Sequence, residues 1–175
     1  MAVTPTPRTE ADDIILHLKR AHAGDPWHGP SRAALLKDVT APIAAWEPGA
    51  GAHSIWKQVL HMRNWTREVE ARVLGAAPDR DGVPVGGDWP AVTDTSETAW
   101  RETLASLDAA HEQLVRVVRS LPATRLHEHV GATPDKPDGT GIRVSTMLKS
   151  LAEHDIYHSG MVSLLARLAR AALKS

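Results

Sequence analysis

Four long segments of the chain repeat apolar residues at spacings of three and four, and no other feature constrains its fold as strongly. An α-helix has 3.6 residues per turn, so this repeat gathers the apolar side chains on one helical face. The segments are expected at 9–23, 54–75, 95–122 and 145–172, with a shorter helix at 31–39. Helices of this kind bury their apolar faces against one another. The pattern therefore predicts an all-α fold, a four-helix bundle with long connections and one short extra helix.

The ends of the predicted helices coincide with residues that favour helix termini. Thr9 and Ser54 are suited to N-caps, because their hydroxyls accept hydrogen bonds from free backbone N–H groups. Gly75 and Pro122 end the second and third long helices. The stretch 75–94 has no helical spacing and several prolines and glycines, so it is predicted to be a long loop.

The length and charge of the chain limit its organisation and partners. It has 175 residues without an internal repeat or boundary, which predicts a single domain over 1–175. Its 20 basic and 21 acidic residues are evenly spread, so we expect no nucleic-acid partner. The chain has no cysteine, which excludes disulfides and thiolate metal sites. We also expect a cytoplasmic protein without a membrane partner, because no apolar run approaches about 20 residues and no signal peptide is evident.

Two histidines interrupt the apolar face of the last predicted helix. His154 and His158 are four residues apart, so they stack on one face with Cβ atoms about 5–6 Å apart. At this separation both imidazoles can bind one ion through metal–nitrogen bonds of about 2.0–2.1 Å. Two imidazoles make a weak site, and His61 on the second helix is the best candidate for a third ligand. Three histidines leave a coordination position open, which is typical of catalytic metal sites.

The alternative is that these histidines are core residues satisfied by hydrogen bonds. Pairs at this spacing arise readily by chance in a chain with ten histidines. A buried pair of imidazoles must, however, find partners for every ring nitrogen, and a shared metal satisfies one nitrogen of each ring. Spacing by itself leaves both interpretations open.

Three segments of the sequence are similar to a known family. They are PWHGPSRAALLKDV (26–39), HSIWKQVLHMRNW (53–65) and LAEHDIYHSGMVSLL (151–165), and they resemble the DinB-like (DinB/YfiT) superfamily of bacterial proteins. The similarity covers nearly the whole chain. It implies a four-helix bundle that holds a divalent metal through one histidine on the second helix and an HxxxH pair on the last. The implied ligands are His61, His154 and His158.

The resemblance implies a metal-dependent enzyme, either a hydrolase or a transferase of a low-molecular-weight thiol. The expected partner is a small-molecule substrate or thiol, and no residue is assigned a catalytic role. The alternative is a non-catalytic stress-response or ligand-binding protein with a structural or vestigial metal site. Zinc and nickel both suit imidazole ligands, so the metal stays open between them. Apolar helix faces and six tryptophans are consistent with a homodimer.

Other polar residues near these positions have less specific roles. Asp155 lies at the border of the apolar face and is either a surface residue or a carboxylate that orients a ligand imidazole. Tyr157 is expected to point away from that face. His28 and His53 precede helices and are expected in turn or capping roles, although both can line the mouth of a site. His111 is expected to be a core or boundary histidine.

Overall fold

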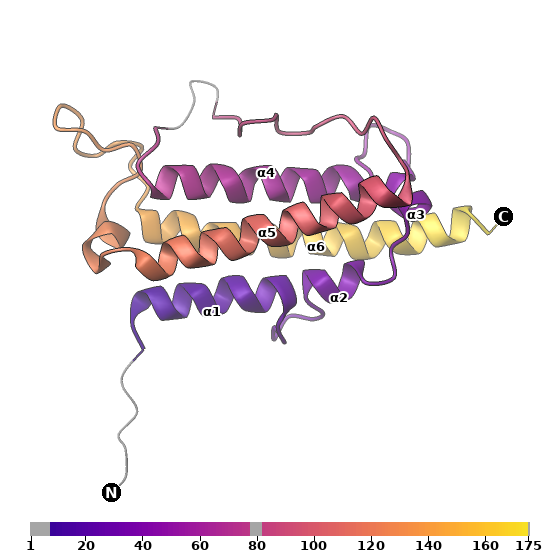
Figure 1. Cartoon of the computed structure of the whole chain (residues 1–175), viewed down its shortest axis with the longest axis horizontal. Coiled ribbons are helices and arrows are strands. Elements are labelled where there is room, and N and C mark those ends of the chain that lie inside the picture. The colour runs from indigo at the N-terminus through magenta and orange to yellow at the C-terminus, as the bar shows by residue number, and fades with distance from the viewer. Residues whose placement is uncertain (1–7, 78–81, 175) are drawn as a thin grey trace, which may run out of the picture.

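The computed structural model describes residues 8–77 and 82–174. This part of the chain contains six α-helices and one 3-10 helix (Figure 1). In chain order they are α1 (Glu10–Ala23), α2 (Arg32–Leu36), α3 (Ala41–Ala45), α4 (Ile55–Val73), α5 (Glu97–Ser120), η1 (Ala123–His127) and α6 (Val144–Ala172). The all-α prediction and its four long helices are confirmed. The short helix expected at 31–39 is α2, and α3 is a second short helix that the periodicity did not indicate.

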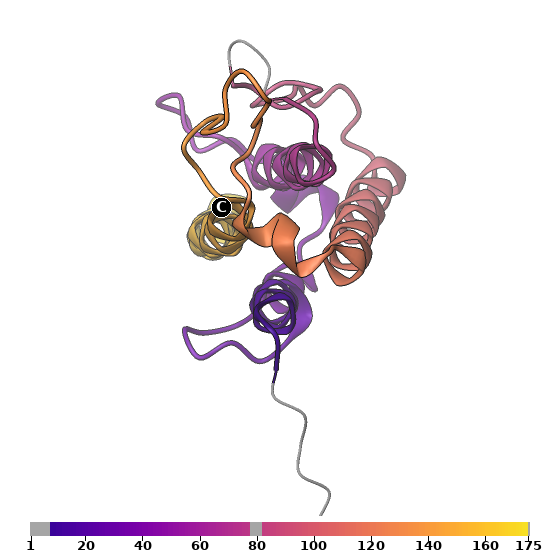
Figure 2. The ribbon, with the colours of Figure 1, turned by 90° about the vertical axis from the view of Figure 1, so that its left-hand side faces the viewer.

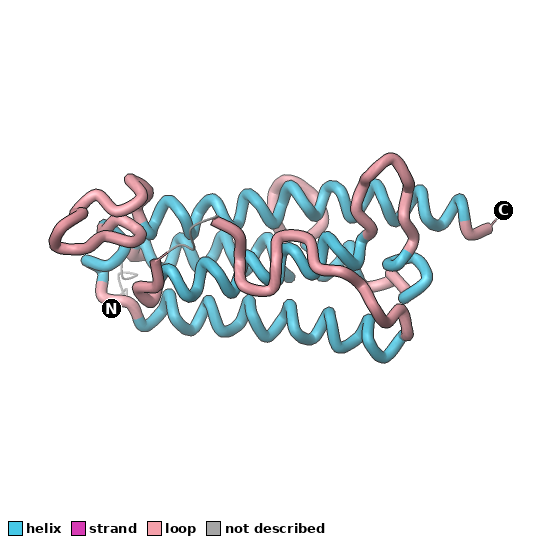
Figure 3. Tube along the Cα trace, turned by 90° about the horizontal axis from the view of Figure 1, so that it is seen from above, coloured by secondary structure: helices cyan, strands magenta, loops and turns pink. Residues whose placement is uncertain are grey.

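The four long helices form the corners of a bundle, as the end-on view in Figure 2 shows. α4 packs against α5 and α6, and α1 packs against the same two helices, so α1 and α4 lie at opposite corners. α4 and α5 run in the same direction, and the connection between them returns along the whole length of α4 (Figure 1). This long crossover replaces the short loop that an antiparallel pair would use. It also brings residues 82–94 over the outer side of the bundle, which Figure 3 shows from above.

The capping residues expected from the sequence, Thr9 and Ser54, begin two of the long helices. The Thr9 side chain accepts from the backbone N–H of Asp12, and the Asp12 carboxylate accepts from the backbone N–H of Thr9, which completes a capping box. Ser54 caps α4 and Ser96 caps α5 in the same way, each through its hydroxyl oxygen. Gly75 follows α4 with a φ of 108°, a conformation that favours glycine. Local chemistry thus accounts for where these helices start and stop.

The core is divided into two apolar clusters by a layer of buried polar side chains at mid-length. One cluster joins α1 to the C-terminal halves of α4 and α5 and the start of α6, and the other joins α2 and α3 to the opposite ends. Between them the helices contribute polar residues of low exposure, namely Arg32, Gln58, His61, His111, Asp155 and His158. Buried polar groups need partners. This polar layer is therefore where a functional site is to be sought.

The connection between η1 and α6 is irregular within the described residues. It is closed by isolated antiparallel bridges between His129 and Arg143 and between Thr133 and Lys136. None of the described helices combines the length and the apolar character that a membrane crossing requires.

Candidate metal centre

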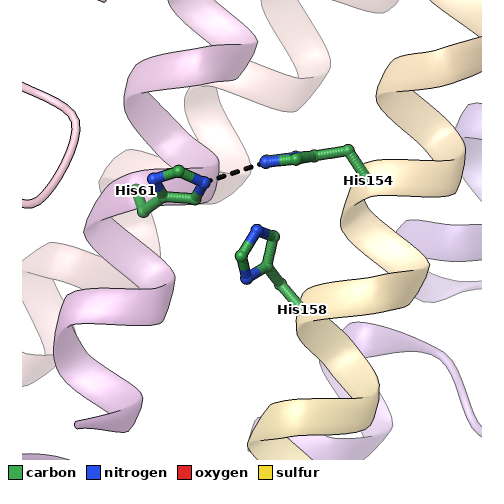
Figure 4. A group of neighbouring side chains, drawn as sticks. All are labelled: His61, His154 and His158. Carbon is green, nitrogen blue, oxygen red and sulfur yellow. Dashed lines mark hydrogen bonds between the residues drawn. The ribbon is translucent and has the colours of Figure 1, made fainter. Parts of the chain in front are cut away.

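His61 faces His154 and His158 across the contact between α4 and α6 (Figure 4). The Nε2 atoms of His61 and His154 are 2.9 Å apart. The ring centroid of His158 lies 4.5 Å from that of His61 and 4.4 Å from that of His154. One nitrogen of each ring lies within 4.8 Å of the other two, a separation that a single metal ion can bridge. The structure therefore brings together all three residues singled out in the sequence.

The second ring nitrogen of His61 and that of His158 each face an oxygen that can only accept. Nδ1 of His61 is 2.8 Å from the backbone oxygen of Asp88, and Nδ1 of His158 is 2.6 Å from Oε1 of Gln58. Both Nδ1 atoms must therefore carry the proton and donate. In a neutral imidazole this leaves the lone pair on Nε2, the atom directed at the centre of the cluster. Both rings are thus held in the tautomer that a metal requires.

The second ring nitrogen of His154 faces the carboxylate of Asp155. Nδ1 of His154 lies 3.8 Å from Oδ1 of Asp155, and neither buried atom has a hydrogen-bond partner among the described residues. Nε2 of His61 is an acceptor, so in a neutral pair His154 would have to donate from Nε2. Its Nδ1 would then present a lone pair to the Asp155 carboxylate, and two buried acceptors would face each other without a donor.

A cation between the ring nitrogens resolves this conflict. A metal shared by the Nε2 atoms lets His154 keep its proton on Nδ1, toward the Asp155 carboxylate. A doubly protonated His154 would also satisfy both contacts. A metal would in addition use the lone pair of His158, which converges on the same point. The donor set therefore fits a divalent cation.

The protonation of the cluster also suits metal binding. Burial lowers the pKa of His61, and burial together with the neighbouring His154 and His61 lowers the pKa of His158 to about 4. Both rings are consequently neutral at pH 7, the form in which imidazole binds metals.

Asp155 is held as a carboxylate by Arg32. Burial by itself would raise the pKa of the Asp155 carboxyl, but Nη1 of Arg32 lies 2.5 Å from its Oδ2, and this guanidinium holds the pKa below the usual range. Asp155 is thus a buried side chain beside the site, and the surface role considered from the sequence is wrong for this residue. Its ionised Oδ1 is available to the imidazole of His154.

The polar layer continues from Arg32 to the far side of the bundle. Nη2 of Arg32 donates to Nδ1 of His22 at 2.7 Å, and the ring of His22 stacks on His111 with centroids 3.9 Å apart. Burial lowers the pKa of His22 to about 3 and that of His111 to about 4, with the Arg32 charge acting in the same direction. Sequence spacing did not identify Arg32. The available signal was a charged residue four positions before Leu36, on the buried side of a short helix.

The loop over residues 82–94 covers the histidine cluster. The indole of Trp89 is stacked between His53, at a centroid distance of 3.7 Å, and His61, at 4.1 Å. His53 therefore packs the loop against α4, and the expected turn or capping role does not describe it. His28 lines a separate cavity between α1 and α6, away from the three histidines.

Hydrogen bonds hold the same loop to α4. Asn64 donates through Nδ2 to the backbone oxygen of Gly87 at 2.9 Å, and Trp65 donates through Nε1 to Oδ1 of Asp88 at 2.8 Å. Gly86 has a φ of 92°, and a Cβ there would lie 3.1 Å from Nδ2 of Asn64, so the close approach requires glycine. The sequence predicts a plain loop for this stretch and does not single out Asp88 or Trp89. Four prolines and glycines flank these two residues, and the stretch therefore shows no helical or strand periodicity.

A cavity of about 590 Å³ opens beside the three histidines between α4 and α6. Its walls are mainly apolar, and Arg72 lies among the lining residues. Tyr157 is 67% exposed, in agreement with the expectation that it points away from the core, and it contributes to the rim of this cavity. The residues along the cavity between the histidines and Arg72 are Trp65, Val69, Met147, Ser150 and Leu151.

The fold and site define a helical-bundle protein with a three-histidine cluster at the wall of a cavity. The family model of the DinB superfamily matches residues 32–162, and the chain belongs to this superfamily. The match includes Arg32 and all three histidines, and it confirms the resemblance seen in the sequence. No curated protein and no solved structure gives a significant match to the chain.

Proposed function

We propose that this protein is a divalent-metal-dependent enzyme whose metal ligands are His61, His154 and His158. The observation that carries the proposal is the convergence of three imidazoles whose second nitrogens each face an acceptor. A divalent cation held by three neutral histidines supplies a Lewis acid with an open coordination position, which can activate a bound water or thiol. Zinc and nickel are the proposed metals, since both suit imidazole ligands.

The surrounding residues would orient the ligands. The Asp88 carbonyl and the Gln58 side chain fix the rings of His61 and His158 through their Nδ1 protons. Asp155 would do the same for His154, and Arg32 keeps its carboxylate ionised. Partners of this kind set the tautomer and the ring direction of metal-binding histidines.

The cavity supports a small-molecule substrate. It borders the three histidines and is walled mainly by apolar side chains. A molecule bound in it would displace water from the proposed metal site. The chemistry that we propose is either hydrolysis or the transfer of a low-molecular-weight thiol onto an electrophile. In both cases the open metal position and the cavity would hold the nucleophile and its target side by side.

A non-catalytic binding protein is the second candidate, and one observation favours it. Asp88 is the one carboxylate among the described residues lining the cavity, and its Oδ1 already accepts from Trp65. The site thus offers a single carboxylate as a general base, and one of its oxygens is already engaged. In this alternative the metal captures a ligand or has a structural role.

We also propose that the protein forms a homodimer through the exposed side of α6. Tyr157, Leu164 and Leu168 are 67%, 43% and 44% exposed, and their spacings of seven and four place them along one face of the helix. Sedimentation velocity would give a dimer for the native chain and a monomer for the Leu164→Glu/Leu168→Glu variant. A native monomer would contradict this assignment.

Metal analysis of protein purified without a chelator or a nickel column tests the main proposal. We expect about one zinc or nickel ion per chain, lost in His61→Ala and retained in His28→Ala, which alters an exposed histidine outside the cluster. A native protein that binds neither metal would exclude the metal-dependent enzyme. With cobalt in the site, thiolate absorption on addition of a small thiol supports the transferase, whereas ester hydrolysis without it supports the hydrolase.

A further inference from the structure

Arg72 lies in the cavity wall with one of its donors unused. Its Nε donates to Oε1 of Glu68 at 2.8 Å, and its guanidinium carbon lies 5.6 Å from the ring centroid of Trp65. Nη2 is buried and has no acceptor among the residues that the structure describes. A buried donor without a partner is unfavourable. Nη2 of Arg72 therefore lacks an acceptor among the described residues, whereas Nε is paired with Glu68.

The neighbouring protein groups are already engaged. The buried carboxylate of Glu68 binds the Nε of Arg72. Arg125 donates to the backbone oxygen of Arg72 and pairs with the carboxylate of Glu128 at 2.6 Å. Arg72 lines the cavity, so a molecule bound there can supply a further acceptor to its guanidinium.

The distance between Arg72 and the histidine cluster defines the length of such a molecule. The ring centroids of His61 and Trp65 are 6.3 Å apart, and Trp65 lies 5.6 Å from the Arg72 guanidinium carbon. Together these two distances set an upper limit of 11.9 Å between the His61 ring centroid and the guanidinium carbon. The wall between the two ends is largely apolar, with Val69 and Leu151 on it.

We propose that the cavity binds an elongated small molecule with a carboxylate at Arg72, an apolar middle along Trp65, and a thiol at the histidine cluster. The guanidinium favours a carboxylate over a neutral oxygen because its planar donors can bind both oxygens at once. The thiol end rests on the metal site proposed above, whereas the carboxylate end depends on Arg72 alone. The substrate class is therefore a thiol that also carries a carboxylate, with a spacer long enough to reach between two protein groups that are at most 11.9 Å apart.

Chain length is the variable that tests this arrangement. The probes are mercaptopropionate, mercaptohexanoate, mercaptooctanoate and mercaptoundecanoate, each with its thiol and carboxylate at opposite ends, and the alkanethiols and mercaptoamides of equal length. Binding is followed by the cobalt–thiolate absorption of the cobalt-loaded protein. We expect the carboxylate to raise affinity about tenfold over the alkanethiol at an intermediate length. The shortest and longest probes should show little gain.

Variants at Arg72 assign the gain to this residue. Arg72→Gln should remove the carboxylate gain while leaving alkanethiol affinity unchanged, and Arg67→Gln, an exposed arginine on the same helix, should change neither. Because Arg72→Gln leaves Glu68 buried without its partner, Glu68→Gln/Arg72→Gln is measured alongside it. The double variant should also lose the gain and remain folded.

The outcomes separate this inference from the proposed metal site. If cobalt–thiolate absorption appears but no length shows an Arg72-dependent gain, or if amides bind as tightly as carboxylates, the carboxylate site is wrong and the metal site stands. If no cobalt binds, the metal proposal fails. Octanoate and octanol are then compared on the metal-free protein by calorimetry. An Arg72-dependent preference for octanoate supports the carboxylate site, and equal binding overturns it.

Discussion

Nη1 of Arg32 lies 2.5 Å from Oδ2 of Asp155, and this buried ion pair joins α2 to the helix that carries two of the three clustered histidines. Both side chains are at most 5% exposed. Buried ion pairs contribute little net stability, because the desolvation of both charges offsets their attraction. Asp155 of this pair lies beside His154, and we infer that it orients this imidazole. Substitution of both partners of the ion pair distinguishes this role from a purely structural one.

Replacing the ion pair by apolar residues should weaken metal binding without unfolding the protein. In Asp155→Leu the Arg32 charge is left buried and unpaired, so we expect a loss of about 3–5 kcal/mol in the free energy of unfolding. In Arg32→Met/Asp155→Leu no charge remains, and most of that stability should return. Metal affinity should still be about 10–100-fold below wild type, because His154 has lost its partner.

The measurements for these variants are urea unfolding of the metal-free proteins and zinc affinity by competition with a chelating dye. If the double variant recovers both its stability and its zinc affinity, Asp155 has only a structural role.

Metal binding should raise the thermal stability of the native chain. At a free zinc concentration of about 100 times Kd, a ligand that binds only the folded state stabilises it by about 2.7 kcal/mol. For a chain of this size that corresponds to a rise in Tm of about 5–10 °C. Scanning calorimetry with zinc and with chelator measures the shift. His61→Ala should show no shift and His28→Ala the full one, whereas a shift retained in His61→Ala would remove that residue from the ligand set.

The stability of the metal-free protein should fall as the pH decreases below about 6.5, the ordinary pKa of histidine. The pKa of His22 is lowered to about 3 and that of His111 to about 4, mainly by burial. The unfolded chain therefore binds more protons than the folded one in this range, and protonation favours unfolding. The stability that these neutral rings provide is complete above pH 6.5 and is lost toward pH 4, with a slope of up to about 1.4 kcal/mol per pH unit for each ring.

Urea unfolding at several pH values, with chelator present, tests the contribution of these two rings. His22→Gln/His111→Gln should show a shallower decline between pH 6.5 and 4 than the wild type, since the other titrating groups are common to both proteins. Equal slopes would mean that neither ring stays neutral in the folded state.

Trp89→Ala should release the loop over 82–94 from the histidine cluster. The substitution removes the indole stacked between His53 and His61, and it leaves the hydrogen bonds of Asn64 and Trp65 to the loop in place. We expect faster amide hydrogen exchange over 86–92 and weaker zinc binding, because the ring of His61 loses its packing partner. Trp27→Ala is the matched control, since Trp27 is fully exposed. Unchanged exchange in Trp89→Ala would show that the Trp89 ring is not needed to hold the loop.

The helices were predictable because their determinants are local. Periodicity, the caps at Thr9 and Ser54, and the stop at Gly75 act within a few residues of one another, and so does the pairing of His154 with His158. His61 was assigned through its position on the second helix and the family resemblance. Its convergence with the other two histidines follows from the packing of α4 against α6.

The surroundings of the cluster were decided by tertiary structure alone. Asp155 meets Arg32 across 123 positions of sequence, and His61 meets the Asp88 carbonyl across 27. Contacts of this kind have no period, because they depend on how whole helices and a crossover loop pack and not on the turn of one helix. The sequence by itself determined the bundle and named its three histidines. Only the packed structure decided which groups orient them, what covers them, and that their cavity extends to Arg72.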